Sequence, residues 1–217
     1  MLRQAFEQSL VELHHDLYDM GQAVLSQLER TAVAFQEENS ELAAEIMVFD
    51  EDINFRELAL ETKSVELMAL QHPVGGDLRR IITVLKASSD IERMGDHLRS
   101  IAQSIIQLSN SGSLSEMTEP INAIFEALTL LLEETFETYR AQDPDKAILI
   151  ATWDETINRI YKETQDRLTD YIKNYPERIE NGREYYQILL HLERLGDYAK
   201  DVCAWIVYLG IGKIVNL

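Results

Sequence analysis

Two short motifs occur twice in this chain, in the same order and at nearly the same spacing. The first reads Phe-Asp-Glu-Asp-Ile-Asn at residues 49–54 and Trp-Asp-Glu-Thr-Ile-Asn at residues 153–158, an offset of 104 positions. The second reads Glu-Arg-Met-Gly-Asp at residues 92–96 and Glu-Arg-Leu-Gly-Asp at residues 193–197, an offset of 101 positions. A long fixed period indicates an internal duplication. The two halves should therefore fold alike and carry two equivalent acidic sites.

The charge balance limits the kinds of partner that the chain can bind. Its 217 residues include 38 acidic and 20 basic side chains, which give a formal net charge of −18. Nucleic-acid binding is not expected, because neutralising phosphates requires clustered Lys and Arg. Direct docking on anionic lipid is disfavoured for the same reason. The charge favours a partner with a basic surface, or bound cations.

The sequence predicts a cytoplasmic protein without direct membrane insertion. No stretch approaches the ~18 uninterrupted apolar residues of a transmembrane helix, and the amphipathic N-terminus lacks the apolar segment of a signal peptide. The single cysteine, Cys203, cannot form an internal disulfide, which suits a reducing cytosol. Because Cys203 lies among Val202, Ala204, Trp205 and Ile206, we expect a small buried side chain.

Long periodic stretches separated by scarce Gly and Pro predict long helices and short loops. Asn39 or Ser40 can cap the second helix, Pro73 suits the start of the third, and Asp143 caps the fifth before Pro144. The expected helices cover about residues 3–36, 40–71, 73–108, 116–141, 144–174 and 183–209. The loop-like segment 109–113 lies where the duplication places the joint between the halves.

The fold class is therefore all-α, with two tandem pseudo-symmetric three-helix bundles made of six long antiparallel helices. The first repeat should cover residues 1–110 and the second residues 114–217. A helix of ~30 residues is a rod of about 45 Å.

The repeated motifs place acidic and amide side chains four residues apart, which is one helical turn. These pairs are Asp50 and Asn54, Glu92 and Asp96, Asp154 and Asn158, and Glu193 and Asp197. If the second and third helices of each half run antiparallel, the two pairs of that half lie at similar levels. Three carboxylates and one amide should then converge in each bundle, where like charges raise each other's pKa unless a cation lies among them.

Two interpretations of these acidic sites stay open at this point. An all-oxygen site suits a hard or borderline cation such as Mg²⁺, Ca²⁺, Mn²⁺ or iron. Alternatively, Arg93 and Arg194 neutralise the acids in ordinary ion networks without a metal. A carboxylate-bridged di-iron centre is not supported, because Gly95 and Gly196 occupy the positions that require His. His97 follows Asp96, but Tyr198 takes the equivalent place in the second half.

Other chemistry has little support in the sequence. We find no Gly-rich phosphate loop, Ser or Cys nucleophile motif or His/Cys metal set, so no catalytic residue and no organic cofactor is expected. His14 and His15 lie in an acidic helix and should be solvated. Arg79 and Arg80 could receive an acidic partner or pair with nearby acids.

Taken together, the motifs resemble those of the PhoU family of phosphate-uptake regulators. The resemblance rests on Asp-x-x-Ile-Asn at residues 50–54, Gln-His-Pro-Val at 71–74, Asp-Leu-Arg at 77–79 and Asp-Ile-Glu-Arg-Met-Gly-Asp at 90–96. The second half contains the corresponding motifs Asp-x-x-Ile-Asn at 154–158 and Leu-Glu-Arg-Leu-Gly-Asp at 192–197. It spans essentially the whole chain.

This resemblance implies a cytoplasmic, often homodimeric, non-enzymatic protein. Such proteins are negative regulators of phosphate uptake and of transcription of the phosphate regulon. Their partners are the ATPase subunit of a Pst-type ABC phosphate transporter and a sensor histidine kinase. An alternative is a carboxylate-rich metalloprotein with hydrolase or oxidase activity, and a third possibility is a purely structural helical scaffold.

The resemblance also implies metal ligands on the bundle surface, with iron, zinc or another divalent cation as the occupant. The implied ligands are Asp50, Glu92 and Asp96 in one half and Asp154, Glu193 and Asp197 in the other. Asn54 and Asn158 depart from the family pattern, which commonly has Asp there. Asn still offers a carbonyl oxygen, but each loses one negative charge, so a metal-free or single-ion site is also consistent with the motif.

Overall fold

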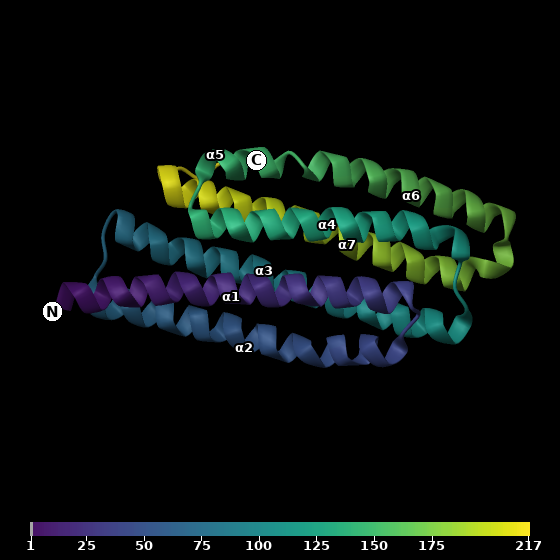
Figure 1. The fold of residues 1–217 in the computed structure, drawn as a ribbon, viewed down its shortest axis with the longest axis horizontal. Helices are drawn as coiled ribbons and strands as arrows, with labels where there is room; N and C mark the ends of the chain where they lie inside the picture. Colours follow the sequence, from purple (N-terminus) through teal and green to yellow (C-terminus); the bar gives the residue numbers. More distant parts are fainter. Residues whose placement is uncertain (1) are drawn as a thin grey trace.

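A computed structural model describes residues 2–217, and this part of the chain is helical with no β-strand (Figure 1). The helices are α1 (Leu2–Gln36), α2 (Ser40–Gln71), α3 (Gly76–Ser111), α4 (Ser115–Ala141), α5 (Pro144–Ala151), α6 (Asp154–Asn174), the 3₁₀ helix η1 (Pro176–Arg178) and α7 (Ile179–Ile211). The predicted all-α class is confirmed, and α5 and α6 together form the fifth of the six rods.

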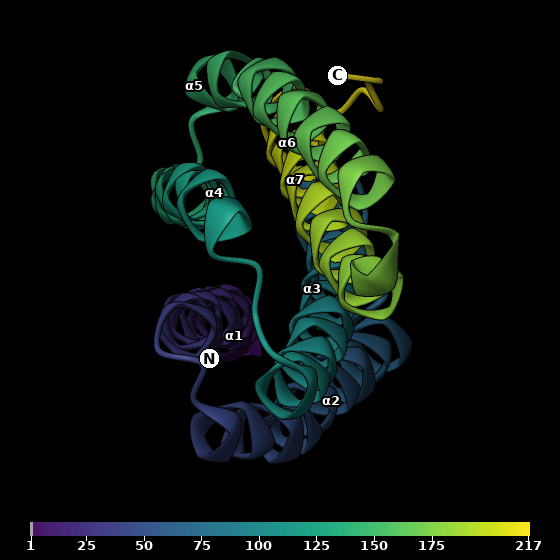
Figure 2. The same ribbon diagram turned by 90° about the vertical axis from the view of Figure 1, so that its right-hand side faces the viewer.

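The rods form two three-helix bundles that lie side by side, as the duplication predicts. Figure 2 shows α1, α2 and α3 in one half of the molecule and α4 to α7 in the other. The two halves meet along α3 and α7, with α1 packed on α4. One continuous apolar core runs through both bundles. None of the helices in residues 2–217 combines the length and hydrophobicity needed to cross a membrane.

The predicted periodicity explains which helix faces are buried. On α1, the side chains spaced three or four residues apart all lie in the core, and they are Leu10, Leu13, Leu17, Met20, Val24 and Leu28. Two predicted caps are also present. The Asn39 side chain accepts a hydrogen bond from the Leu42 backbone N–H, and Asp143 accepts from the N–H groups of Asp145 and Lys146.

Two predicted boundaries around α3 were wrong. Pro73 does not open the helix, which begins at Gly76 after a turn that places Gly75 at a φ of 59°. At the other end, α3 continues through the polar residues 109–111, where Ser109 and Ser111 bond to carbonyls of the preceding turn. The joint between the halves is therefore the short segment 112–114.

The fifth rod is interrupted, although the sequence predicted one continuous helix. At Thr152 and Trp153 the backbone N–H groups bond three residues back, to Leu149 and Ile150, in a tighter turn than the α-helix. The Thr152 hydroxyl also donates to the Leu149 carbonyl at 2.7 Å and competes with the helical bond. A new helix, α6, then begins at Asp154, inside the repeated motif.

The last helix begins earlier than the expected residue 183, because Asn181 and Gly182 serve packing instead of a turn. The Asn181 amide donates to the carbonyls of Ser111 and Gly112, at 3.1 and 2.5 Å, and so ties the first turn of α7 to the joint between the halves. A Cβ at Gly182 would overlap the side chain of Ile172 on α6. Cys203 is buried as expected, and burial raises the pKa of its thiol to about 11.

Close packing between the halves should make Gly21 intolerant of a side chain. An added Cβ there would lie 2.6–2.9 Å from three ring carbons of Phe136, which is itself buried. We expect Gly21→Ala to lower the free energy of unfolding by about 1–3 kcal/mol through overpacking, measured by chemical denaturation. Gly76→Ala is the matched control, because its nearest neighbour is 3.8 Å away. Equal stability of the two variants would contradict this packing.

Candidate functional site

The first acidic cluster forms where α2 crosses α3. Asp50 on α2 is only 6% exposed and lies against Gly95 of α3, where a Cβ would stand 3.5 Å from Oδ1. Within residues 2–217, that Oδ1 has no hydrogen-bond partner. The glycine thus allows the close approach of α2 that the sequence suggested, with Ile53 Cγ2 3.2 Å from the position of a Cβ and the Asp50 oxygen beside it.

The acidic side chains of this cluster influence one another. The pKa of Asp50 is raised, first by burial and then by the charge of Asp96, while Arg99 and a hydrogen bond from Asn54 act in the opposite direction. Burial also raises the pKa of Glu92, with further contributions from Asp96, Glu57 and Asp50. The charges of Asp50, Glu92 and Asp96 are therefore close enough to influence one another.

The second cluster repeats the arrangement where α6 crosses α7. Asp154 is 4% exposed, and a Cβ at Gly196 would lie 3.0 Å from its Oδ1, which likewise lacks a hydrogen-bond partner in the part of the chain described. The Asn158 amide donates to Asp154 Oδ2 at 2.9 Å. Burial raises the pKa of Asp154, and it raises that of Glu193, to which Asp197 adds.

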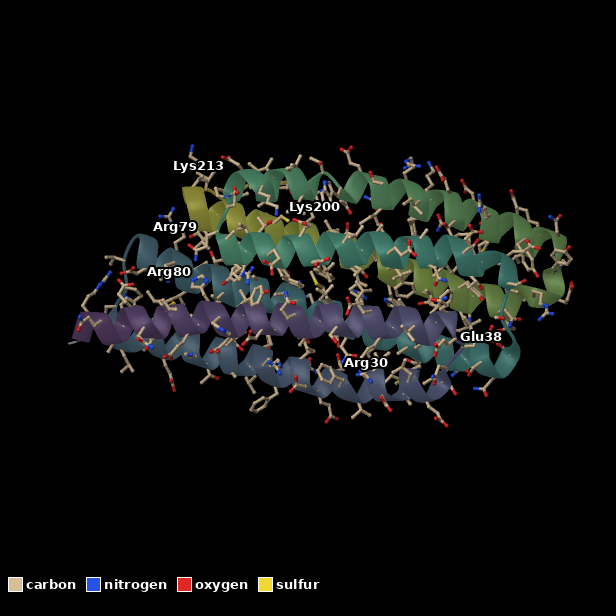
Figure 3. The ribbon with its side chains drawn as sticks, viewed as in Figure 1. Arg30, Glu38, Arg79, Arg80, Lys200 and Lys213 are labelled. Atoms are coloured by element: carbon tan, nitrogen blue, oxygen red, sulfur yellow. The ribbon has the colours of Figure 1, made fainter. Side chains whose placement is uncertain are left out.

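Each buried aspartate has a basic side chain close to its second oxygen. Arg99 Nε lies 4.0 Å from Asp50 Oδ2, and Lys200 Nζ lies 3.8 Å from Asp154 Oδ2. Arg99 and Lys200 occupy equivalent positions, 101 residues apart, each seven residues after the glutamate of its motif. Figure 3 labels Lys200 in the upper half of the molecule, which holds the C-terminal bundle. Both halves therefore balance the buried charge in the same way.

The expected neutralisation by Arg93 and Arg194 is only partly present. Arg194 contacts the acids of its own motif, at 3.0 Å from Asp197 and 3.9 Å from Glu193. Arg93 instead reaches Asp90 at 3.8 Å and stacks over the ring of Tyr198. Arg194 thus pairs with acids of its own half, whereas Arg93 also contacts Tyr198 of the other half.

The donor chemistry of both clusters fits an oxygen-preferring cation, since each offers carboxylates and a buried oxygen without a partner. Their spacing is less suitable. Among residues 2–217, no three His, Cys, Asp or Glu side chains gather closely enough to hold one ion. A basic side chain lies close to Asp50 and to Asp154. Asp96 is exposed, and Glu92 and Glu193 are partly exposed.

Sequence reasoning missed five residues in or next to these sites. Glu57 lies seven residues after Asp50 on the same face of α2, and its equivalent in the second half is Tyr161. Arg99 and Lys200 could have been found by extending the repeat alignment beyond the motif. His191 could not, because its role depends on the packing between the halves.

His97 and His191 face each other at the centre of the molecule. Their Nδ1 atoms are 2.8 Å apart, so one imidazole donates and the other accepts, and Tyr198 stacks on His97 with ring centroids 5.5 Å apart. Burial lowers the pKa of His97 to about 4, and the neighbouring His191 and Arg194 also lower it, while Asp96 opposes them. Burial lowers the pKa of His191 too.

The remaining candidates have structural roles. His14 is buried and bonded to the Tyr139 hydroxyl, so its predicted solvation was wrong, whereas His15 is exposed. Figure 3 shows Arg79 and Arg80 at the end of the molecule where Lys213 lies. Arg79 packs against Gly212 at the C-terminus of α7, where a positive charge is favourable, and Arg80 pairs with Glu7 at 3.4 Å.

The histidine pair predicts a loss of stability in acid. Because the folded-state pKa of His97 is about 4, against 6.5 for an unperturbed His, the unfolded chain binds more protons between these pH values. Stability should therefore fall as the pH decreases from about 6.5 to about 4. Since His97 is partly exposed, we expect its share to be roughly 1–2 kcal/mol.

His97→Gln should reduce this acid sensitivity, measured by denaturant unfolding at several pH values. His14 titrates in the same range and is present in both proteins, so the difference isolates the pair. His15→Gln, at an exposed histidine away from the pair, is the control for the substitution itself. An unaltered profile for His97→Gln would show that the pair does not stabilise the junction.

Comparison with known proteins places this architecture among characterised ones. The family model described as PhoU domain matches residues 17–105 and 121–206. A phosphate-specific transport system accessory protein PhoU homolog from Streptococcus pneumoniae is 32% identical over 216 residues, which covers 100% of both chains. A Pseudomonas putida homolog with the same description is 30% identical and covers 99% of this chain and 84% of its own.

Solved structures are similar over nearly the whole chain. The phosphate transport system regulatory protein PhoU from Streptococcus pneumoniae has a TM-score of 0.91 at 32% identity, covering 98% of this chain and 100% of that one. PhoU from Pseudomonas aeruginosa has a TM-score of 0.92 at 28% identity, covering 96% and 100%.

Proposed function

The chain belongs to the PhoU family, and from that premise we propose that it is a negative regulator of phosphate uptake and of phosphate-regulon signalling. Relatives across the full length are named as accessory proteins of phosphate-specific transport, which supports a regulatory role in phosphate transport. The protein acts by binding and not by catalysis, as a cytoplasmic adaptor. It needs no nucleic-acid contact, consistent with its net charge of −18.

The partners in this proposal are the ATPase subunit of a Pst-type ABC phosphate transporter and a sensor histidine kinase. A strongly acidic protein associates fastest with basic surfaces, and complementary charge fixes the orientation of docking. The two acidic clusters are equivalent by the internal repeat, so one chain offers two similar faces. One of them could bind the transporter while the other binds the kinase.

The observation that carries the proposal is the duplicated buried aspartate beneath surface acids. Burying a carboxylate is costly unless it is paired and hydrogen-bonded. Both halves nevertheless keep Asp50 or Asp154 at the helix crossing, with one oxygen unpartnered among the residues described. Each aspartate faces a basic side chain of the adjoining helix, Arg99 at 4.0 Å or Lys200 at 3.8 Å, and we propose that this contact fixes the positions of the outer acids.

Removing the outer acids should derepress phosphate uptake. We expect Glu92→Ala or Glu193→Ala to raise uptake in phosphate-replete cells while the helical content stays that of the wild type, because both side chains reach the surface. Labelled phosphate uptake and circular dichroism measure the two effects. Glu133→Ala, an exposed acid on α4 outside both clusters, is the control. If uptake stays fully repressed in both cluster variants, these acids do not form the regulatory surface.

Co-purification tests the partner directly. The ATPase subunit should be retained by the wild-type protein to different extents at high and low phosphate, and less by the Glu92→Ala and Glu193→Ala variants. Retention that is independent of phosphate and of both substitutions would favour a structural scaffold.

The clusters are also where we propose that a cation binds, with iron, zinc or another divalent ion as the candidates. The ligands would be Asp50, Asn54, Glu92 and Asp96 in one half, and Asp154, Asn158, Glu193 and Asp197 in the other. Since three of these side chains do not gather around one point, binding would require the outer acids to move inward.

Elemental analysis of protein purified without chelator tests this cation proposal. We expect metal in up to two equivalent sites, and about half of it should be lost from Asp96→Asn, with Asp197→Asn affecting the other half. Asp145→Asn, in the first turn of α5, is the control. Absence of metal from the wild type would leave the ion-paired arrangement, and metal together with turnover would favour the alternative of a hydrolase or oxidase.

We also propose that the functional form is a homodimer. In this form the partner is a second copy of the chain, and the two copies share a surface distinct from the one that binds the transporter.

A further inference from the structure

The helix α2 has two apolar faces, although only one of them faces the core. Its inner face carries Ile46, Ile53 and Leu60, which are at most 2% exposed. On the opposite side runs a second row that we call the outer seam, formed by Ala44, Val48, Glu51, Phe55, Leu58, Thr62, Val65 and Ala69. All eight outer-seam residues are exposed, and six of the eight are apolar.

The outer seam lies on the outside of the molecule. α2 packs against α1 and α3, and Figure 2 shows it at the edge farthest from the C-terminal half. The largest seam side chains are well exposed, with Phe55 at 71%, Val48 at 70%, Leu58 at 57% and Val65 at 51%. An exposed and mostly apolar row of this length on a protein surface indicates an interaction site.

The spacing of the outer seam is that of a coiled coil. Its members alternate steps of four and three residues without exception from Ala44 to Ala69. This is a period of 3.5 residues, sustained over more than three heptads, and such a row keeps facing a partner helix along its whole length. A helix that is simply packed on a globular core needs no second row of this kind on its solvent side.

Positions at equal distances from the two ends of the seam carry identical residues in the outer pairs and different residues in the inner pairs. Counted inward from its ends, Ala44 matches Ala69 and Val48 matches Val65; Glu51 then matches Thr62, and Phe55 matches Leu58. In an antiparallel pair of identical helices related by a twofold axis, each residue faces its match on the other copy. We infer that the outer seam of α2 is a self-association surface, which pairs two copies of this chain antiparallel with Phe55 and Leu58 at the centre.

This register places compatible side chains in every layer. Ala meets Ala and Val meets Val, and the Glu51 carboxylate can accept a hydrogen bond from the Thr62 hydroxyl of the second copy. The aromatic and branched side chains of Phe55 and Leu58 fill the middle. A twofold interface of this kind must be self-complementary, and a row with matched Ala and Val pairs around a central Phe–Leu pair is consistent with that requirement.

The flanks of the seam are consistent with the same occupant. On one side Met47 comes next to Met68 of the second copy, and Asn54 next to Glu61 of the second copy. On the other side lie the acids Glu45, Asp52 and Glu66. Two of these are already neutralised within the chain, since Arg30 pairs with Glu45 at 2.6 Å and Arg56 with Asp52 at 2.6 Å. Figure 3 labels Arg30 in the N-terminal bundle.

The second half of the chain serves as an internal comparison. At the repeat offset of 104 residues, the seam positions from Glu51 to Ala69 correspond to Glu155, Arg159, Lys162, Asp166, Thr169 and Lys173 on α6. That face is charged and has no apolar row. Each chain thus carries one seam, which closes a pair of copies and stops there, whereas two seams would allow open chains to grow.

The size of the seam sets the expected strength of association. It spans 26 residues, or about 38 Å, and two helices of about 10 Å diameter cover a strip of roughly 400 Å² on each copy. A standard interface covers about 800 Å² per partner. The dimer should therefore be reversible, with a population that depends on protein concentration.

This inference rests on the homodimer part of the proposed function, and sedimentation of the full chain tests it. The wild type should form dimers as its concentration rises, and Leu58→Glu should weaken association at least tenfold, because two charges would face the centre of the seam. Leu130→Glu is a closely matched control, since Leu130 on α4 is 58% exposed and Leu58 is 57% exposed. Circular dichroism checks that both variants stay helical.

Cysteine cross-linking tests the antiparallel register. A mixture of Val48→Cys and Val65→Cys proteins should give a cross-linked dimer with a short thiol-reactive linker, whereas either variant alone should give little. Cys203 is buried, which keeps it out of the reaction. Efficient cross-linking of Val48→Cys alone would indicate a parallel pair and overturn the inference.

Two further results would overturn it. One is equal weakening of association by Leu58→Glu and Leu130→Glu, and the other is a wild type that stays monomeric at about 100 μM, where a dimer with a micromolar Kd would be populated. In the latter case the seam would serve a helix of a different protein. Phosphate uptake by the Glu92→Ala and Glu193→Ala variants is measured separately. A chain that does not self-associate would therefore overturn the seam inference without deciding the regulatory proposal.

Discussion

The close approach of two helices at a glycine, with a carboxylate buried at the crossing, determines most of what this molecule can do. At Gly196 the absence of a Cβ lets Asp154 enter the contact between the motif helices, and at Gly95 it leaves room for Ile53 beside Asp50. A carboxylate in that position must be compensated. The compensation comes from a residue one turn along, Asn54 or Asn158, and from Arg99 or Lys200 on the facing helix.

The motif residues are therefore best understood as one unit made of a buried acid, an amide, a glycine and a base, beneath outer acids. Because the unit occurs twice, the two clusters share their geometry but not their surroundings. Glu57 adds a carboxylate to the first cluster, whereas Tyr161 takes its place in the second. The outer face of α2 is apolar and that of α6 is charged. The two halves therefore share a scaffold through duplication but differ on the outer faces of α2 and α6.

The sequence was sufficient for the features that depend on local periodicity. The buried row from Leu10 to Leu28 predicted α1. Antiparallel pairing of the second and third helices predicted similar levels for Asp50, Glu92 and Asp96, whose charges do influence one another. The sequence was insufficient where contacts between residues far apart in the sequence determine a helix boundary or a side-chain pair. Asn181 reads as a turn residue but is held in a helix by carbonyls 70 and 69 positions away. The pairing of His97 with His191 needs the register of α3 on α7, which no single helix pattern contains.

The position of Asn54 links the two surfaces of the first bundle. Its amide stabilises the charged form of Asp50 on one side, and on the other it lies at the flank of the outer seam, next to Glu61 of a second copy in the inferred pair. An amide that turned toward that glutamate would leave Asp50 with less support, so pairing of the chains and the arrangement of the first cluster would be thermodynamically linked. Asn158 has no such neighbour, because the α6 face is charged. The second cluster would then keep the same properties in monomer and dimer, and it is the better placed of the two to recognise a partner at any concentration of the protein.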